Sequence, residues 1–230
     1  MHTTRTIKIL SAALLTTLAT SFVSALAQSI KLPKNSKLQE YVEDYLPTDY
    51  KEGEDPLSTP DMKPRSTELV KLGWKYFYEK DLSSALKRFF MAIRMDKTNP
   101  SAYFGVAFVC SVQNDLDDAI VFYREALKYE KHYAPIYANL AKALLMEDAN
   151  AAEAPGLLNE AIKVDPKCGA AYVTYASYYG QHKRWKESGD MAQHATDCGE
   201  KIDSSLVDEL KAHKINIVVK PLPSVERRLH

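Results

Sequence analysis

Apolar and small residues recur at helical spacing along most of this chain. They lie three or four positions apart on one face of residues 103–110, and a second stripe of the same kind follows the Asn114-Asp115 turn. This spacing puts one face of a helix toward a core and the other toward water. We therefore predict a pair of helices, with the stripes made of Tyr103, Val106, Ala107 and Cys110, then Ala119, Phe122, Tyr123, Ala126 and Leu127.

The same helix pair recurs at a nearly constant period. An apolar residue followed by a small one returns at Leu72-Gly73, Val106-Ala107, Leu140-Ala141 and Tyr175-Ala176, at spacings of 34, 34 and 35 residues. Three further columns keep the same step: Tyr103, Tyr137 and Tyr172; Ala85, Ala119, Ala154 and Ser188; and Ala92, Ala126, Ala161 and Ala195. A small side chain where two helices cross lets their axes come close. The period therefore predicts repeated pairs of tightly packed helices.

The predicted fold is all-α, an α-α superhelix of about four helix pairs. No single pair can bury both of its faces, so stacked pairs share one core. The predicted repeats span residues 66–99, 100–133, 134–168 and 169–199. A capping helix within residues 200–214 follows, with Leu206, Val207 and Leu210 facing inward, and residues 215–230 form an extended tail.

These columns resemble the tetratricopeptide repeat (TPR) family. The first unit contains Leu69-x2-Leu72-Gly73-x2-Tyr76 and later Ala85-x3-Phe89, and the other units keep most of these positions. The resemblance covers roughly residues 66–199. Two features depart from the pattern: the closing proline is present only at Pro166, and the third unit has an extra residue in its Glu147–Glu153 turn.

The resemblance implies a function and a place for it. Proteins of this family usually bind extended peptides or helices on a concave groove built from the first helix of each pair. The residues at the matching positions or on neighbouring rows are Val70, Trp74, Phe77, Tyr78, Phe104, Phe108, Asn139 and Lys142. Large apolar rings outside the core columns are typical of a binding surface, and the alternative is that neighbouring helices cover them.

One class of ligand, an acidic peptide held by its terminal carboxylate, is disfavoured. Family members that clamp a carboxylate terminus use lysine, asparagine and arginine at groove positions. The matching positions here hold Val70, Trp74, Gly105, Pro135 and Asn139, of which Asn139 alone fits. An apolar or aromatic segment suits this groove better than an acidic tail.

The first 27 residues are expected to be a secretion signal rather than part of the fold. Arg5 and Lys8 precede an apolar stretch, and Ala25-Leu26-Ala27 places small residues where a signal peptidase cleaves. The alternative is a retained membrane anchor, for which the stretch is short and rich in hydroxyl residues. We expect an exported protein, periplasmic or secreted, that meets the membrane only through this signal.

Residues 28–65 are expected to form a proline-rich, charged tether. A short amphipathic helix is predicted within residues 37–46. Two interpretations stay open: a loosely packed tether, or a segment whose residues Leu38, Tyr41, Val42 and Tyr45 dock on the repeats and occupy the groove.

The composition and net charge of the chain narrow the classes of partner to expect. Hydrophobic residues make up 46% of the chain and charged residues 26%, as in soluble globular proteins, and only 8 residues are glycine, which favours helix. Loss of residues 1–27 removes two of 30 basic residues and no acid, leaving a net charge of −2. This balance gives no reason to expect nucleic acid as a partner.

Three cysteines are present, and an exported protein meets oxidising conditions. Cys168 precedes the first predicted helix of the fourth unit and Cys198 ends the second, so antiparallel packing brings them together. A Cys168–Cys198 disulfide is therefore possible, with free thiols as the alternative. Cys110 lies in a core column and is expected to be a buried thiol.

No catalytic, cofactor-binding or metal-binding motif is present in the sequence. We therefore expect a non-enzymatic scaffold or adaptor that binds a protein or peptide, with no cofactor and no small-molecule substrate. The alternative from another class is a self-associating structural protein of the cell envelope, a homo-oligomer. A hydrolase hidden among the carboxylate pairs is the third hypothesis.

Overall fold

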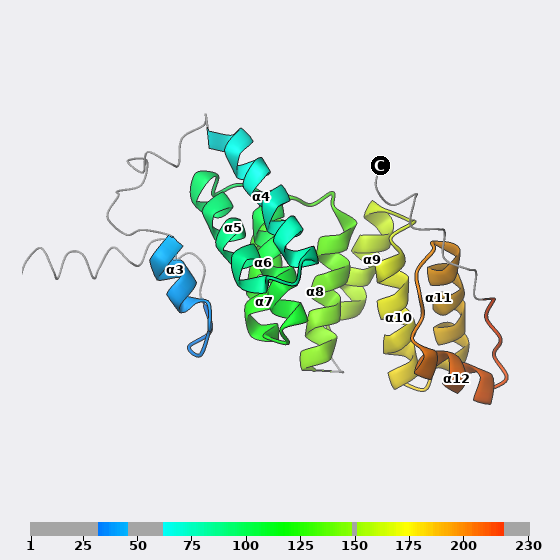
Figure 1. The fold of residues 1–230 in the computed structure, drawn as a ribbon. Coiled ribbons are helices and arrows are strands. Elements are labelled where there is room, and N and C mark those ends of the chain that lie inside the picture. Colours follow the sequence, from blue (N-terminus) through cyan, green and yellow to red (C-terminus); the bar gives the residue numbers. More distant parts are fainter. Residues whose placement is uncertain (1–31, 46–61, 149–150, 219–230) are drawn as a thin grey trace, which may run out of the picture. The chain divides into compact units, whose positions relative to one another are not determined.

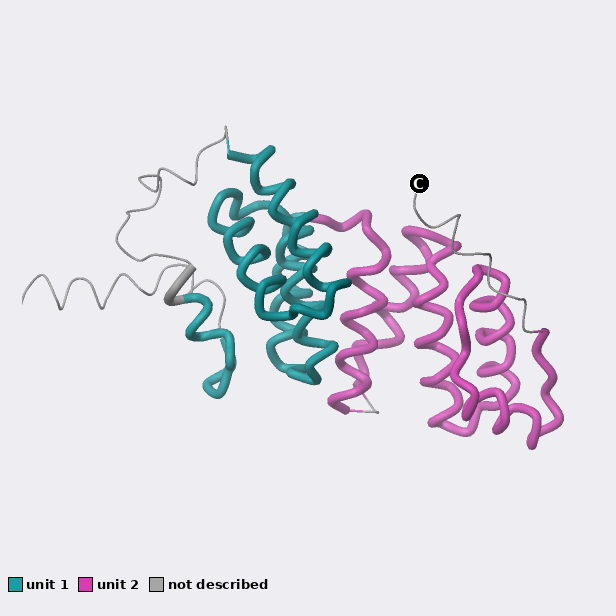
Figure 2. Tube along the Cα trace, in the orientation of Figure 1, with its two compact units in different colours: residues 1–129 teal, residues 130–230 magenta. Residues whose placement is uncertain are grey.

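The computed structural model describes residues 32–45, 62–148 and 151–218. Those ranges contain ten helices and no strand (Figure 1). The predicted signal peptide lies outside the described residues, as does most of the predicted tether. The chain divides into two compact units, residues 1–129 and 130–230 (Figure 2). None of the described helices is long and apolar enough to span a membrane.

The first unit holds two helix pairs and one short additional helix. The pairs are α4 (Lys63–Tyr78) with α5 (Leu82–Met95), and α6 (Pro100–Val112) with α7 (Leu116–Tyr129). The short helix is α3 (Gln39–Tyr45), and it packs against α5. Within the unit, α6 also packs on both α4 and α5, so the two pairs share one core, as the repeat predicts.

The second unit also holds two pairs, followed by one helix. The pairs are α8 (Ala134–Glu147) with α9 (Ala154–Val164), and α10 (Gly169–Gln181) with α11 (Trp185–Asp197). Helix α10 also contacts α8 and α9, which again joins the pairs through one core. The last helix, α12 (Ser204–Ala212), packs on α11. It ends two residues before the predicted limit. It buries Leu206 and Leu210, whereas Val207, which was also predicted to face inward, is half-buried.

The small columns of the repeat lie where the helices of each pair cross. All members of the two second-helix columns are fully buried: Ala85, Ala119, Ala154, Ser188, Ala92, Ala126, Ala161 and Ala195. The serine that replaces alanine in the fourth unit keeps its hydroxyl satisfied, because Ser188 donates to the carbonyl of Ala176 at 2.8 Å. A buried hydroxyl without such a partner would destabilise the core.

The tyrosine column has a function in the turns that the spacing alone does not reveal. The hydroxyls of Tyr103, Tyr137 and Tyr172 each donate to the carbonyl six residues earlier, at 2.9, 3.3 and 3.2 Å. The acceptors lie in the turns that lead into α6, α8 and α10. Each ring therefore ties the start of a first helix to the turn before it.

The first repeat begins earlier than predicted. Helix α4 starts at Lys63, whereas the sequence assigned residues up to 65 to the tether. Pro64 lies in the first turn of the helix, where its missing N–H costs no hydrogen bond. Ser66 is buried and donates to the carbonyl of Ala92 at 2.8 Å, which holds this first turn against α5.

The start of the C-terminal tail lies along α11. Ile215 occupies the space above Gly189, where an added Cβ would come within 2.4 Å of it. The Gln193 side chain accepts from the N–H of Val218 at 2.8 Å and donates to its carbonyl at 3.5 Å. These contacts hold residues 215–218 as an extended strip along α11; the rest of the predicted tail, residues 219–230, lies outside the described ranges.

Helix α3 docks on the second helices of its unit, not in the groove. Leu38 and Val42 are buried, Tyr41 stacks on Phe90 of α5, and Ser36 binds Asp118 of α7. Of the two interpretations of this segment, the docked one fits these contacts, but Leu38, Tyr41 and Val42 dock on second helices and not in the first-helix groove. The physical reason is that its basic and hydroxyl residues find acidic partners at the start of α7. The side chain of Tyr45 lies outside the described set.

Candidate protein-binding surface

Five aromatic side chains of the first helices form one continuous patch in the first unit. We call Trp74, Phe77 and Tyr78 of α4 with Phe104 and Phe108 of α6 the aromatic patch. The Trp74 ring is central, with its centroid 5.6, 6.5, 5.9 and 5.5 Å from the rings of Phe77, Tyr78, Phe104 and Phe108. Phe77 also meets Phe108 edge-on at 5.4 Å. The rings therefore support one another in the geometries that aromatic pairs prefer.

The patch is graded from a buried base to an exposed edge. Tyr78 is 78% exposed, whereas Trp74, Phe77 and Phe108 are half-buried. Phe104 is only 8% exposed, because the rings of Trp74, Phe108 and Tyr123 surround it. The sequence placed Phe104 and Val70 on the open surface of the groove. The structure buries both, so neither presents a free side chain, and Phe104 forms the floor of the patch.

Phe89 of α5 supports the patch from inside the core. Its ring is fully buried and lies 5.3 Å from that of Trp74, edge to face. A Cβ added to Gly73 or Gly105 would come within 2.6 or 2.4 Å of this ring. The two glycines therefore create the space for Phe89 between α4 and α6. Sequence reasoning found Phe89 only as a core position and missed that it fixes Trp74.

The surroundings of the patch carry little unbalanced charge. On α4, Lys71 pairs with Glu68 at 2.8 Å and Lys75 with Glu79 at 3.9 Å, and all four side chains are exposed. The Tyr123 ring lies against that of Phe104, and burial raises the pKa of its hydroxyl. Surface pairs of this kind contribute little free energy, but each places an acid beside its lysine.

Two of the predicted groove residues belong to the second unit. The Asn139 amide donates to the carbonyl of Pro135, one turn earlier in α8, at 2.8 Å. Its donor is therefore engaged within its own helix. Lys142 is exposed on α8. The first helices of the second unit have three more residues at the repeat positions that match Val70 and Trp74: Ala138 is buried, Val173 is half-buried and Ser177 is exposed.

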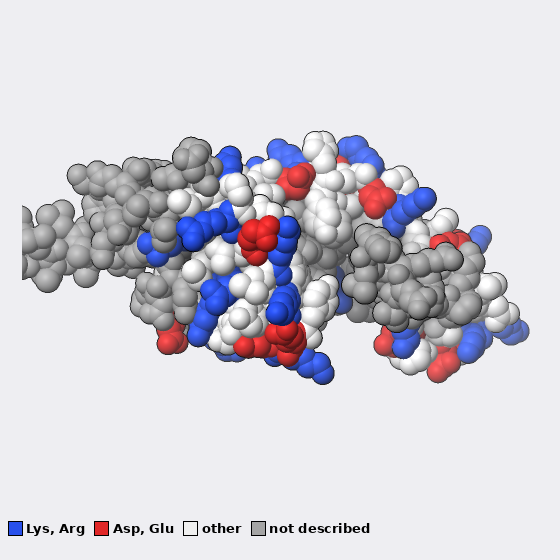
Figure 3. All heavy atoms as spheres, turned by 45° about the horizontal axis from the view of Figure 1, so that its top comes forward, with Lys and Arg blue, Asp and Glu red and all other residues white. Residues whose placement is uncertain are grey.

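The charged residues of the described surface are mixed in sign. Figure 3 shows Lys and Arg side chains interspersed with Asp and Glu on the face in view, with no broad area of one sign. Within the described ranges, no three His, Cys, Asp or Glu side chains are grouped so that they could hold a metal ion.

The cysteines of the fourth helix pair are neighbours in the second unit. Cys168 is buried just before α10 and Cys198 follows α11, and both are thiols in the structure. A Cβ added to Gly169, beside Cys168, would come within 3.2 Å of the Cys198 Cβ. Burial raises the pKa of both thiols, which slows their reaction as thiolates.

We expect a Cys168–Cys198 disulfide after exposure to an oxidant such as glutathione disulfide. The bridge would close a loop of about 30 residues, which stabilises by about 3–4 kcal/mol in the chain-entropy model. Alkylation followed by intact-mass measurement should find one free thiol, and three after reduction. The variant Cys198→Ser should carry the same number of alkylated thiols before and after reduction, and oxidation should not stabilise it. Three alkylated thiols in the oxidised sample would refute the pairing.

Comparison with known proteins shows the fold. No protein-family model matches the sequence, and no curated protein does either. Among solved structures, the chain is similar to a thermophilic TPR protein of Thermus thermophilus. The TM-score is 0.55 and the sequence identity 14%, over 65% of this chain and 82% of that one. The chain has a TPR-like fold. It is therefore an all-α repeat of neighbouring helix pairs.

The predicted groove residues include all five members of the patch, and the structure brings these five together. No polar cluster elsewhere in the first unit was predicted from the sequence. Ser36, Lys37, Asp115 and Asp118 form a polar cluster on the second helices, described below. A signal for it is present in the sequence, because Ser-Lys precedes an amphipathic stretch and two acids flank the start of a predicted helix. Without the fold, nothing indicates that these two pairs meet.

Proposed function

We propose that the chain is an exported, non-enzymatic adaptor that binds an apolar or aromatic segment of a partner protein on its first-helix surface. The aromatic patch carries this proposal. Exposed Tyr78 and the half-buried rings of Trp74, Phe77 and Phe108 offer clustered apolar surface on α4 and α6. Aromatic side chains of this kind dominate the binding energy of protein interfaces.

The arrangement of the chain's own ends supports this proposal. The described parts of both ends pack on second helices, α3 on α5 and α7, and residues 215–218 on α11. Neither uses the aromatic patch in its described contacts. The balanced charge around the patch favours an apolar ligand, whereas an acidic ligand would need unpaired cations. Export is proposed from the N-terminal sequence, with its basic start, apolar stretch and Ala25-Leu26-Ala27.

We expect Tyr78→Ala to weaken partner binding by about tenfold or more, because exposed tyrosines at the edge of an aromatic cluster are frequent hot spots. The same change should alter the free energy of unfolding by less than about 0.5 kcal/mol, since the side chain is mostly exposed. The measurements are quantitative pull-down from the compartment to which the chain is exported and urea denaturation.

The matched control is Tyr129→Ala, which removes another exposed tyrosine ring from the second helix α7. It should leave binding unchanged. Equal loss of binding in both variants, or in neither, would contradict the first-helix surface. Light scattering during size exclusion tests the competing function: a concentration-dependent oligomer of the chain without other partners would favour self-association.

A further inference from the structure

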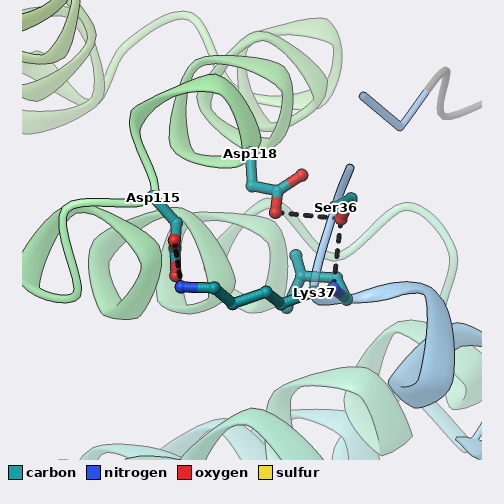
Figure 4. Close-up of polar contacts among 5 residues, drawn as sticks. Ser36, Lys37, Asp115 and Asp118 are labelled. Carbon is teal, nitrogen blue, oxygen red and sulfur yellow. Dashed lines mark hydrogen bonds and ion pairs between the residues drawn. The ribbon is translucent and has the colours of Figure 1, made fainter. Parts of the chain in front are cut away.

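A polar clasp joins the segment before α3 to the start of α7. The Ser36 hydroxyl donates to Asp118 Oδ2 at 2.9 Å, and Lys37 Nζ donates to Asp115 Oδ1 at 2.7 Å (Figure 4). The Ser36 hydroxyl also accepts from the N–H of Leu38 at 3.1 Å, which orders the entry to the helix. The segment therefore presents a hydroxyl and a cation together to two acids on the repeat.

Two buried side chains and one ring anchor the same segment. Leu38 is 3% exposed and Val42 is 5% exposed. The Tyr41 ring stacks on that of Phe90 at 6.0 Å and 18°, and its hydroxyl donates to Ser83 Oγ at 3.1 Å. A short amphipathic helix that lays its apolar face on other helices is a common mode of peptide recognition. Here the ligand and the site belong to one chain.

The clasp leaves one hydrogen-bond acceptor of the site without a donor. Asp118 is only 3% exposed, and its Oδ1 atom is buried without a hydrogen-bond partner. Lys37 Nζ donates to Asp115, and the Ser36 hydroxyl donates to Oδ2, the other carboxylate oxygen of Asp118. Burial, together with the nearby Asp115 and Asp117, raises the pKa of Asp118, while Ser36 and Lys37 act in the opposite direction. A buried carboxylate oxygen without a donor is unfavourable.

We infer that this face of α5 and α7 is a second docking site, for a short helix of a partner protein that begins with a hydroxyl residue followed by an arginine, and that residues 36–42 are its built-in, displaceable occupant. The site lies on second helices, so it is separate from the aromatic patch and does not depend on the function proposed for it. The unpaired Asp118 oxygen carries the inference, because it marks an acceptor that the built-in segment does not fill.

Arginine is the residue that completes such a site. Its planar guanidinium has five donors in a fork that can bridge two oxygens, whereas the lysine ammonium acts as a compact point charge. An arginine in place of Lys37 keeps a donor for Asp115 and adds further donors at the start of α7, where Asp118 lies. The built-in segment has the advantage of a high effective concentration, about millimolar for a segment of the same chain. A displacing ligand must exceed this advantage through better contacts.

The test measures binding of a labelled peptide in trans. The peptide has the sequence of residues 34–45, with Lys37 either kept or replaced by arginine, and binding is followed by fluorescence anisotropy. It is titrated into the wild-type chain and into the variant Leu38→Ala with Val42→Ala, which removes the anchors of the built-in helix. We expect the variant to bind at least about tenfold more tightly than wild type, because its own segment no longer competes. The arginine peptide should bind more tightly than the lysine peptide.

Two further variants distinguish an effect of the charged side chains on peptide binding from a loss of folding. Lys37→Glu replaces a 76% exposed cation with an acid that Asp115 and Asp118 repel, so it weakens the clasp while leaving the buried anchors and the fold intact. Asp115→Asn with Asp118→Asn, added to the open chain, should abolish the preference for arginine. Equal affinity of wild-type and open chains for the peptide would overturn the inference, as would no binding to an open chain that is folded by circular dichroism. A concentration-dependent dimer of the open chain would also overturn it, since a second copy would then be the occupant.

Discussion

Replacing Phe89 by alanine should lower the free energy of unfolding of the first unit by about 3–5 kcal/mol. The ring is fully buried, and it fills the space that Gly73 and Gly105 leave between α4 and α6. The loss combines the transfer of an aromatic ring to water with a cavity between α4 and α6. Urea denaturation followed by circular dichroism measures it, with Tyr78→Ala as the exposed control. A change below about 1 kcal/mol would show that the core collapses around the site.

The same contact can be tested from the opposite side. Gly105→Ala places a Cβ within 2.4 Å of the Phe89 ring, and overpacking of this kind typically costs about 1–3 kcal/mol. Combining it with Phe89→Leu should cost less than the sum of the two single changes, because the smaller side chain vacates the space that the new methyl group needs. Additive costs would mean that the two positions do not share one packing site.

Removing Trp74 and Phe108 together should abolish detectable partner binding. Each ring that acts as a hot spot contributes at least about 2 kcal/mol, so the double alanine variant should bind about a thousandfold more weakly. The measurement is the recovery of partners in a pull-down from the compartment that we propose for the chain, compared with wild type. Equal recovery of the same partners by both proteins would remove the first-helix surface from the mechanism.

This experiment needs a check on folding, because Trp74 is in ring contact with five aromatic side chains, including the buried Phe89. The melting temperature of the variant therefore has to be measured beside its binding. If the double variant unfolds, Tyr78→Ala still tests the surface, since its ring is exposed. Tyr129→Ala again serves as the control for loss of an aromatic ring elsewhere in the unit.

The two surfaces of the first unit differ in chemistry in a way that suits different ligands. The aromatic patch lies on first helices and carries apolar rings beside neutralised ion pairs. The clasp site lies on second helices and combines buried anchors with Asp115 and Asp118. A partner segment rich in apolar side chains fits the former, whereas a helix that begins with a hydroxyl and a cation fits the latter.

Local sequence determined the helix pairs and their step. The alanines at positions 85, 119, 154 and their counterparts are fully buried because a close helix crossing tolerates only a small side chain, and this requirement is visible in one dimension. The capping helix was predictable for the same reason, since Leu206 and Leu210 lie one helical turn apart on the face that is buried. Both features depend on neighbours a few residues away.

Other features depend on residues that are distant in the chain, so only the tertiary structure decided them. Phe104 and Tyr78 both belong to the aromatic patch, yet Phe104 is buried because Tyr123 and Trp74 close over it. The position of α3 was likewise beyond the sequence, since Ser36 and Asp118 are 82 residues apart. Periodicity states which face of a helix is apolar. It does not state which other element covers that face, because burial is set by packing between segments that the chain brings together only when it folds.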